Sequence, residues 1–149
     1  MGAIDDIYQD RLLANAGDIT RNQRLENPDA SATVFSRSCG SALTVDINML
    51  DGVITDYGQA VEACVLGSAS ASIFAKVVVG KTREEVVAVR AAMQSMLKKN
   101  GPPPKDEWAE LALLEPARAF TNRHQSILLP FDATVRAFGD ANVAASDQK

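Results

Sequence analysis

Two cysteines, Cys39 and Cys64, are the most reactive side chains in the sequence, and the chain contains no third cysteine. Cys39 stands just before a segment in which apolar and polar residues alternate, and Cys64 stands just before a run of small residues that opens a helix. If the strands between them pair as a hairpin, the two thiols end near each other. Thiolates are soft ligands for zinc, iron and iron–sulfur clusters, so the pair predicts a metal or sulfur site. The alternative is two small buried side chains, because free cysteine is among the most buried residue types.

The local sequence around each cysteine favours this chemistry. Gly40 lets the chain turn sharply and exposes the Cys39 thiol to a ligand. Cys64 precedes a helix N-terminus, where unpaired N–H groups and the helix dipole favour a thiolate. Gly67 and the small residues after it let a ligand or another backbone approach the helix closely. We therefore expect Gly40 and Gly67 to contribute to binding the metal or cluster.

The segment between the cysteines is predicted to be a β-hairpin. Apolar residues occupy alternate positions from Leu43 to Met49, which places the polar residues between them, Asp46 included, on a face in water. Asp51-Gly52 is the favoured two-residue hairpin turn, and residues 53–59 return as the partner strand. Residues 31–37 form one more strand. The sequence therefore predicts an α+β fold with a three-stranded antiparallel β-meander.

The remaining segments have helical patterns. Gly17 fits the end of the first helix, and Thr82 with Glu85 three residues later forms a capping box. Pro130 lies inside the last helical pattern, which predicts either a kink or a later start near Leu129. The chain is expected to be a single domain over residues 1–149, with residues 141–149 as a flexible tail. The expected helices cover residues 4–15, 67–79, 82–99, 106–121 and 123–138.

The charge and hydropathy of the chain exclude several classes of protein. The net charge is −4 and the pI is about 4.9, and the sequence has no basic stripe with interleaved aromatic residues, so we expect no nucleic-acid partner. No apolar run approaches the roughly 20 residues that a transmembrane segment needs. Acidic residues near the start, in place of the Lys or Arg of a secretory signal, predict a cytoplasmic protein. Thiols stay reduced in that compartment, which favours metal or thiol chemistry over a disulfide.

Several segments carry a resemblance to a known family. The most specific is the run from Ala63 to Ser72, which reads Ala-Cys-Val-Leu-Gly-Ser-Ala-Ser-Ala-Ser. The supporting segments are Tyr8, Ser38-Cys39-Gly40, residues 51–56, Val79-Gly80-Lys81 and an insertion-like segment over residues 101–114. Over nearly its whole length the chain resembles the NifU/IscU/SufU family of iron–sulfur cluster assembly scaffolds, and within it a divergent SufU-like branch.

The resemblance implies a SufE/NifU-like fold, in which about five helices pack on one face of the three-stranded sheet. It also implies a site of three cysteines and one aspartate, which receives sulfur from a cysteine desulfurase and holds a nascent [2Fe-2S] cluster, iron or zinc. Carried over by position, the first two cysteines are Cys39 and Cys64, the aspartate falls on Ser41, and the third cysteine falls on Ser126. Two ligand positions are therefore degenerate, because a serine hydroxyl binds iron or zinc poorly at neutral pH. The alternative role of Ser126 is to cap the last helix.

His124 is the only histidine in the chain and stands two residues before Ser126. Imidazole is a good ligand for zinc or iron, so a site made by Cys39, Cys64 and His124 is one interpretation. The other interpretation is a surface histidine at the start of a helix.

We expect a scaffold or sulfur acceptor for iron–sulfur cluster assembly, and not an enzyme. It would bind iron, a [2Fe-2S] cluster or, as an alternative, zinc through Cys39 and Cys64, and transfer cluster or sulfur to recipient apo-proteins. The expected partners are a cysteine desulfurase, those recipients and a second copy of the chain, since two chains could share one cluster through four cysteines. The alternative is a degenerate scaffold fold without metal that serves as an accessory subunit of a larger complex.

Overall fold

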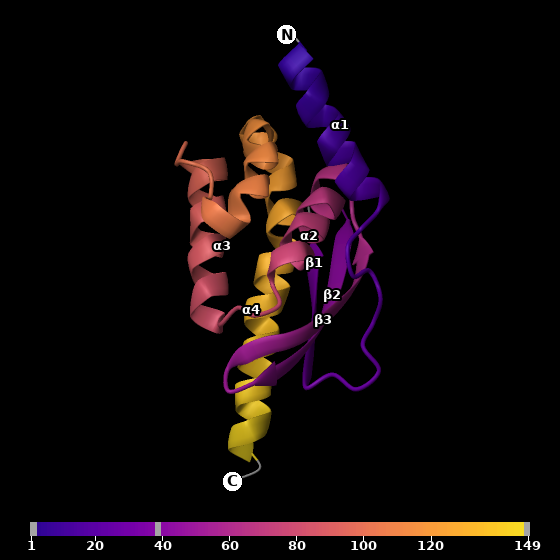
Figure 1. Cartoon of the computed structure of the whole chain (residues 1–149), viewed down its shortest axis with the longest axis vertical. Helices are drawn as coiled ribbons and strands as arrows, with labels where there is room; N and C mark the ends of the chain where they lie inside the picture. Colours follow the sequence, from indigo (N-terminus) through magenta and orange to yellow (C-terminus); the bar gives the residue numbers. More distant parts are fainter. Residues whose placement is uncertain (1–2, 38–39, 148–149) are drawn as a thin grey trace.

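A three-stranded antiparallel sheet forms the centre of the molecule, with the strands in the order β1-β2-β3 (Figure 1). The computed structural model describes residues 3–37 and 40–147, and side chains are described for residues 10–37 and 40–139. The strands are β1 (Ala30–Ser36), β2 (Ser41–Leu50) and β3 (Val53–Glu62). The predicted meander is confirmed, and β2 and β3 both extend beyond their predicted segments.

The turn between β2 and β3 has the predicted form. Asp51 has a φ of 54° and Gly52 a φ of 79°. Two successive residues with positive φ make a turn whose twist matches that of the flanking strands, and Asp-Gly tolerates this backbone well. The turn sets the pairs Leu50–Val53 and Met49–Ile54, and the register of β2 and β3 then shifts between Met49 and Asn48.

One face of β2 lies on the core, and the opposite face is buried at Asp46. Leu43, Val45 and Ile47 face the core, as the alternation predicts. The prediction that Asp46 lies in water is wrong: it is 0% exposed, because the loop between the first helix and β1 covers this face. Arg24 donates to its carboxylate oxygens at 2.6 and 3.0 Å, and the Leu25 N–H donates at 3.0 Å.

The charge of Asp46 is preserved by these bonds and by one more. The Ser31 hydroxyl donates to the carboxylate at 2.5 Å. Burial of the carboxyl would raise its pKa, but the hydrogen bonds from Arg24, Ser31 and Leu25 outweigh burial, so the pKa of Asp46 is lowered. The carboxylate thus ties the loop to the sheet.

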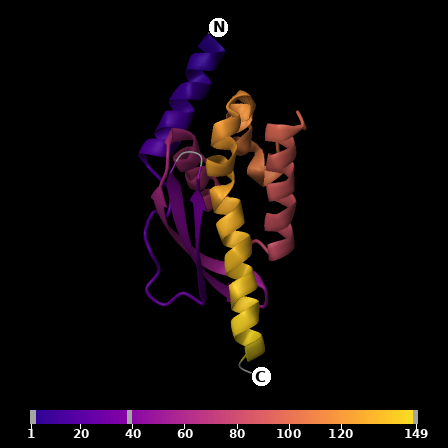
Figure 2. The ribbon, with the colours of Figure 1, turned by 180° about the vertical axis from the view of Figure 1, so that it is seen from behind.

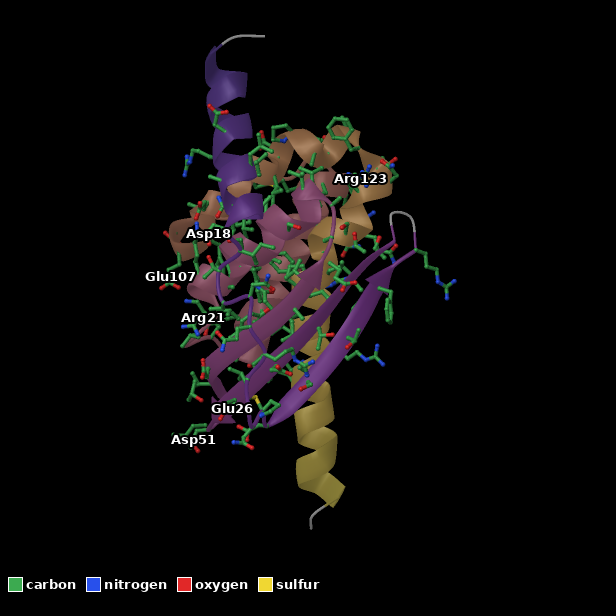
Figure 3. All side chains as sticks on the ribbon, turned by 90° about the vertical axis from the view of Figure 1, so that its right-hand side faces the viewer. Asp18, Arg21, Glu26, Asp51, Glu107 and Arg123 are labelled. Atoms are coloured by element: carbon green, nitrogen blue, oxygen red, sulfur yellow. The ribbon has the colours of Figure 1, made fainter. Side chains whose placement is uncertain are left out.

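The same loop also pairs with the outer edge of β3. The Gln59 N–H is shared between the carbonyl oxygens of Arg21, at 3.2 Å, and Gln23, at 3.1 Å. Gly58 makes this approach possible, because a Cβ there would collide with the Gln23 carbonyl oxygen. Figure 3 shows Arg21 and Glu26 of this loop beside the sheet.

Four α-helices and two stretches of 3₁₀ helix complete the described part of the chain: α1 (Ala3–Gly17), α2 (Val65–Val77), α3 (Arg83–Lys98), η1 (Asp106–Ala119), η2 (Thr121–Arg123) and α4 (His124–Asp147). α2 packs on β3, and α4 packs on β1 and β2. Outside them, α3 packs on α4, and η1 packs on α2 and α3 (Figures 1 and 2). This arrangement confirms the predicted fold class. Across residues 3–37 and 40–147, none of the helices has the length and hydropathy that crossing a bilayer requires.

Phe74, in the second half of α2, is the centre of an aromatic cluster in the core. The centroid of its ring lies 4.8 Å from that of Phe131, 5.5 Å from that of Trp108 and 5.9 Å from that of Tyr57. The contacts with Tyr57 and Phe131 are edge-on, a favoured geometry for aromatic pairs. The cluster joins α2, β3, η1 and α4, with the partly buried Trp108 packed against the core.

The ends of two helices test the predicted caps and boundaries. The capping box is confirmed: the Thr82 hydroxyl accepts from the Glu85 N–H at 3.2 Å, and the Glu85 carboxylate accepts from the Thr82 N–H at 3.2 Å. α4 begins at His124 with Pro130 inside it, so the later start near Leu129 does not occur. α4 also continues to Asp147, and residues 141–147 are helical where a tail was expected.

Candidate functional site at the start of α2

Three elements bring Ser41, Cys64 and Ser126 together at one end of the sheet. Ser41 is the first residue of β2, Cys64 follows the end of β3, and Ser126 lies in the first turn of α4. The antiparallel pairing of β2 with β3 ends at Ala42 and Glu62, one residue after Ser41 and two residues before Cys64. In Figure 3, Asp51 marks the hairpin end of the sheet, and Arg123, just before α4, lies toward the opposite end.

A line of polar contacts joins these three side chains. The Sγ atom of Cys64 lies 3.6 Å from the Oγ atom of Ser126, and the Ser126 hydroxyl donates to the Ser41 Oγ at 2.9 Å. Ser41 is 2% exposed and Ser126 is 0% exposed, whereas Cys64 is half-buried. The site is therefore a thiol that solvent can reach, in contact with a pair of buried hydroxyls. Ser126 does not cap α4, because the helix begins two residues earlier.

The position of Cys64 follows from the way α2 starts. Cys64 is the N-cap residue, with an extended backbone, and its carbonyl oxygen accepts from the Ser68 N–H at 2.8 Å. Its side chain makes no capping hydrogen bond, which leaves the sulfur beside Ser126. Gly67, one turn later, lets α2 approach α4, since a Cβ there would collide with the Ser126 Oγ. Gly67 is thus part of this site through packing, and its contact with cargo stays a prediction.

Cys39 lies outside the described residues, so the predicted proximity of the two thiols stays a prediction. The described residues on either side of this segment are held by hydrogen bonds. The Gly40 N–H donates to the Ser36 carbonyl oxygen at 2.9 Å, and the Arg37 N–H donates to Gln125 Oε1 at 3.2 Å. Gly40 has a φ of 69°, the left-handed region that favours glycine, as expected for a sharp turn. Gln125, which no sequence pattern singles out, therefore connects the end of β1 to α4 by hydrogen bonds.

His124 is buried at the start of α4, with its Nε2 against two carbonyl oxygens of η1. It is 2% exposed, so the interpretation as a surface residue is wrong, while its role as a metal ligand stays a prediction. Its Nε2 lies 3.3 Å from the Ala117 carbonyl oxygen and 3.1 Å from that of Arg118, and because carbonyls only accept, Nε2 carries a hydrogen. That nitrogen is not available to a metal ion. Helical residues two apart point about 200° apart, so His124 faces η1 while Ser126 faces Cys64.

The described donor set does not fit a metal ion or cluster held by one chain. The Ser126 hydroxyl is hydrogen-bonded to the Ser41 hydroxyl, and the His124 Nε2 is hydrogen-bonded to two carbonyl oxygens. Within residues 10–37 and 40–139, no group of three or more His, Cys, Asp or Glu side chains could hold a metal ion. With Cys39 included, the chain offers two thiols where the family site has four ligands.

The fold and the position of Cys64 agree with the family that the sequence resembles. A model of the NifU-like N terminal domain matches residues 4–125, and the chain belongs to this family. The resemblance that the sequence carries is thereby confirmed.

Individual relatives agree with this assignment. The chain is 26% identical over 100 residues to the iron–sulfur cluster assembly scaffold protein IscU of Streptococcus pyogenes serotype M1, a match that spans 67% of this chain and 63% of that protein. The N-terminal part of a nitrogen-fixing NifU-like protein from Brucella abortus is 46% identical, with a TM-score of 0.88 over 95% of this chain and 98% of that one. A structure described as a SUF-system scaffold protein from Fervidobacterium islandicum AW-1 shares the fold, with a TM-score of 0.80 at 18% identity over 92% of this chain and 99% of that one.

Proposed function

We propose that this protein is a sulfur acceptor or scaffold in iron–sulfur cluster assembly, with Cys64 and Cys39 as the residues that carry the cargo. The observation that carries this proposal is the half-buried Cys64 thiol at the start of α2, in a chain of the NifU-like family. Such a protein binds and passes on its cargo and is not an enzyme. Its partners would be a cysteine desulfurase that supplies sulfur and the apo-proteins that receive the product, all in the cytoplasm.

Sulfur suits the described site better than a metal does. A persulfide needs only one nucleophilic thiol, whereas a [2Fe-2S] cluster needs four protein ligands. With two thiols in each chain, a cluster would require two chains or ligands from a partner. Iron or zinc held by Cys39 and Cys64 alone would be bound more weakly than by the four ligands of the family. We therefore propose sulfur acceptance first and a cluster shared by two chains second.

Sulfur transfer to the intact chain tests the first form. The chain is incubated with a cysteine desulfurase and free cysteine, and mass spectrometry should find one added sulfur atom on a cysteine. The variants Cys39→Ser and Cys64→Ser locate that atom, and the double variant, which has no thiol, should gain none. A wild-type chain that gains no sulfur contradicts this form of the proposal.

Anaerobic reconstitution with iron and sulfide tests the shared cluster. Visible absorbance with one cluster for two chains, and its loss in Cys64→Ser, would support it. The variant Ser41→Asp/Ser126→Cys restores the ligand types of the family and serves as the positive control, with metal bound by each single chain. Metal binding that survives in the variant without cysteines would contradict a thiolate site.

The serines at two ligand positions favour one further function, that of an accessory subunit without metal. A stable complex with a protein other than a desulfurase, unchanged in the double Cys→Ser variant, would support it. Loss of function in that double variant would contradict it.

A further inference from the structure

We propose that β1 pairs with β1 of a second copy of this chain, antiparallel and centred on Thr33, so that the two sheets join into one. This edge of the sheet is distinct from the Cys64 site, and the dimer is therefore independent of the function proposed above. Three observations support it: the direction of the backbone groups of β1, an exposed aromatic side chain and the charges at the two ends of the strand.

The two outer strands of the sheet differ in what covers their edges. On β3, the Ile54 N–H donates to the Lys81 carbonyl oxygen at 3.0 Å, and the Gly80 N–H donates to the Ile54 carbonyl oxygen at 2.8 Å. Farther along β3, the Val61 N–H donates to Asn22 Oδ1 at 3.2 Å, beside the loop contacts described above. The other outer strand is β1, at the right of the sheet in Figure 3.

The backbone of β3 shows which groups of β1 point out of the sheet. The Gln59 N–H points away from β2, because it donates to the loop. Gln59 is paired with Val45, and Val45 is paired with Ala32. Since successive residues of a strand direct their N–H and C=O groups to opposite sides, Val45 and Ala32 exchange hydrogen bonds, and the neighbours of Ala32 point outward. The outward residues of β1 are Ser31, Thr33 and Phe35.

Phe35 gives this edge an apolar side chain. It is 65% exposed and lies on the face of the sheet opposite the core. An extended edge strand with a large exposed apolar side chain is a template for pairing with another strand. In the proposed pairing, Phe35 lies opposite Ser31 of the second copy and beside its Thr33, which covers part of the ring.

The symmetric register fits the charges of the strand. Thr33 is the middle residue of β1 (Ala30–Ser36), so antiparallel pairing about it aligns the two strands over their full length. Asp29 lies one residue before the strand and Arg37 one residue after it, and both are exposed. In this register, Asp29 of each copy faces Arg37 of the other. The strand is therefore complementary in charge to a second copy of itself.

Arg136 of α4 opposes the pairing. It is exposed, and its Nη1 lies 3.5 Å from the Thr33 carbonyl oxygen. A carbonyl oxygen has two lone pairs, so it can also accept from the Thr33 N–H of the second copy. The two Arg136 side chains would lie near the symmetry axis and repel each other. The contact is also smaller than the roughly 1,600 Å² of a standard stable interface, so we expect a reversible dimer that forms as the concentration rises.

This pairing keeps the two thiol sites apart. The end of β1 at Ser36 is the end of the sheet where Ser41 and Cys64 lie. In antiparallel strands centred on Thr33, the two copies of Ser36 are about 20 Å apart along the strands. The sites therefore point to opposite ends of the joined sheet, and the two copies would carry cargo separately. A dimer that shares one cluster needs a different contact.

Analytical ultracentrifugation of the full chain, from micromolar to millimolar concentration, measures the dissociation constant of the dimer. Thr33→Pro removes an outward N–H at a position where an edge strand tolerates proline, and it should raise the dissociation constant at least about tenfold. Arg136→Gln keeps a donor and removes the repulsion, so it should lower the constant about two- to threefold. A wild-type chain that stays monomeric throughout overturns the proposal.

The variant Cys39→Ser/Cys64→Ser separates this dimer from one that depends on a cluster. It should dimerise as the wild type does, whatever the outcome of the sulfur-transfer and reconstitution experiments. A dimer that is lost in this variant would overturn the pairing of β1 and would support the shared cluster.

Reversal of charge tests the register without proline. Arg37→Glu sets two acidic residues against each other at both ends and should raise the dissociation constant about three- to tenfold. Arg83→Glu, at an exposed position at the start of α3, changes the net charge equally and should have no effect. Asp29→Lys/Arg37→Glu restores opposite charges and should recover the affinity. Thermal unfolding of this variant is compared with that of the wild type, because Asp29 accepts from the Met49 N–H at 2.8 Å.

Failure of the folded double variant to recover affinity would overturn the register, and so would an equal loss in Arg83→Glu. Cross-linking in the Cys39→Ser/Cys64→Ser background then locates the axis. Thr33→Cys places two cysteines in a pair with Cα atoms about 5.5 Å apart, which a disulfide can bridge under mild oxidation. Phe35→Cys is the control on the same strand, because its two copies would be about 13 Å apart. Equal cross-linking at both positions would overturn the pairing about Thr33.

Discussion

The two halves of α2 are both buried, yet they are built from opposite kinds of residue. The second half carries Ile73 and Phe74, both 0% exposed, and contributes large side chains to the core. The first half carries Gly67 and Ser70, which are also buried but have little side-chain volume. Stability therefore comes from dispersion and hydrophobic burial at one end, and from close approach and hydrogen bonds at the other.

The small half of α2 is held by polar groups of neighbouring elements. The Ser70 hydroxyl donates to the Ile127 carbonyl oxygen on α4, and the Ser72 hydroxyl accepts from the Thr20 N–H at 3.0 Å in the loop after α1. These bonds position the helix start where Cys64 meets Ser126. The Cys64 thiol therefore lies where the side chains of α2 are small and polar, away from the aromatic cluster around Phe74.

The largest effect is expected at the aromatic half. Phe74→Ala removes a ring that contacts three other rings and leaves a cavity, so the free energy of unfolding should fall by about 3–5 kcal/mol. Urea unfolding measures this, and the alkylation rate of Cys64 in the native protein should stay within twofold of wild type. A large change in that rate would mean that the two halves of α2 are coupled.

A smaller loss is expected at the thin half. Gly67→Ala gains about 1 kcal/mol of helix propensity but forces the Ser126 side chain aside, so we expect a net loss of about 1–2 kcal/mol. Gly139→Ala in α4 is the matched control, because its Cβ would meet nothing within 4 Å, and it should gain up to about 1 kcal/mol. Thermal unfolding compares the two, and equal gains would show that α2 has room at Ser126.

Tyr57 of β3, which packs on Phe74 in the aromatic half of α2, should limit the stability of the protein at alkaline pH. Burial raises the pKa of Tyr57 above its ordinary value, with a hydrogen bond to Thr134 lowering it and Asp46 raising it. The folded state therefore keeps the phenol protonated, and its contribution to stability is complete below about pH 10 and is lost as the pH rises further. Unfolding followed from pH 8 to 11 measures the loss. Tyr57→Phe should show a smaller decline over that range, and an identical decline would contradict this origin.

The smallest effect is expected at Val65, beside Cys64. Val65 follows Cys64 in α2 and is 48% exposed. Val65→Ala removes little buried surface, so the free energy of unfolding should change by less than about 0.5 kcal/mol. A loss above 1 kcal/mol in urea unfolding would show that the start of α2 is as tightly packed as its second half.

Local patterns were sufficient where the physical cause is local. The alternation in β2, the Asp-Gly turn and the Thr82 capping box each depend on residues a few positions apart, and each is found in the structure. The family resemblance added the longer step, because it placed Ser41, Cys64 and Ser126 in one site before any distance was known.

Tertiary context decides what those patterns could not. The burial of Asp46 depends on a polar loop that has no periodicity of its own, yet lies across the sheet because Arg24 and Leu25 bind the carboxylate. The orientation of His124 depends on the residue at which α4 begins, since a helix start there separates it from Ser126 by about 200°. Gln125 anchors the end of β1 from an exposed position that no sequence pattern marks.

The loop that pairs with the edge of β3 has a consequence for assembly. Its carbonyl groups at Arg21 and Gln23 already accept from Gln59, so a strand of another chain finds that N–H occupied. The sheet cannot grow on this side without first displacing the loop and breaking the Arg24–Asp46 pair. Two copies that shared a cluster would therefore not meet by pairing their β3 edges, because the loop already occupies that edge in each copy.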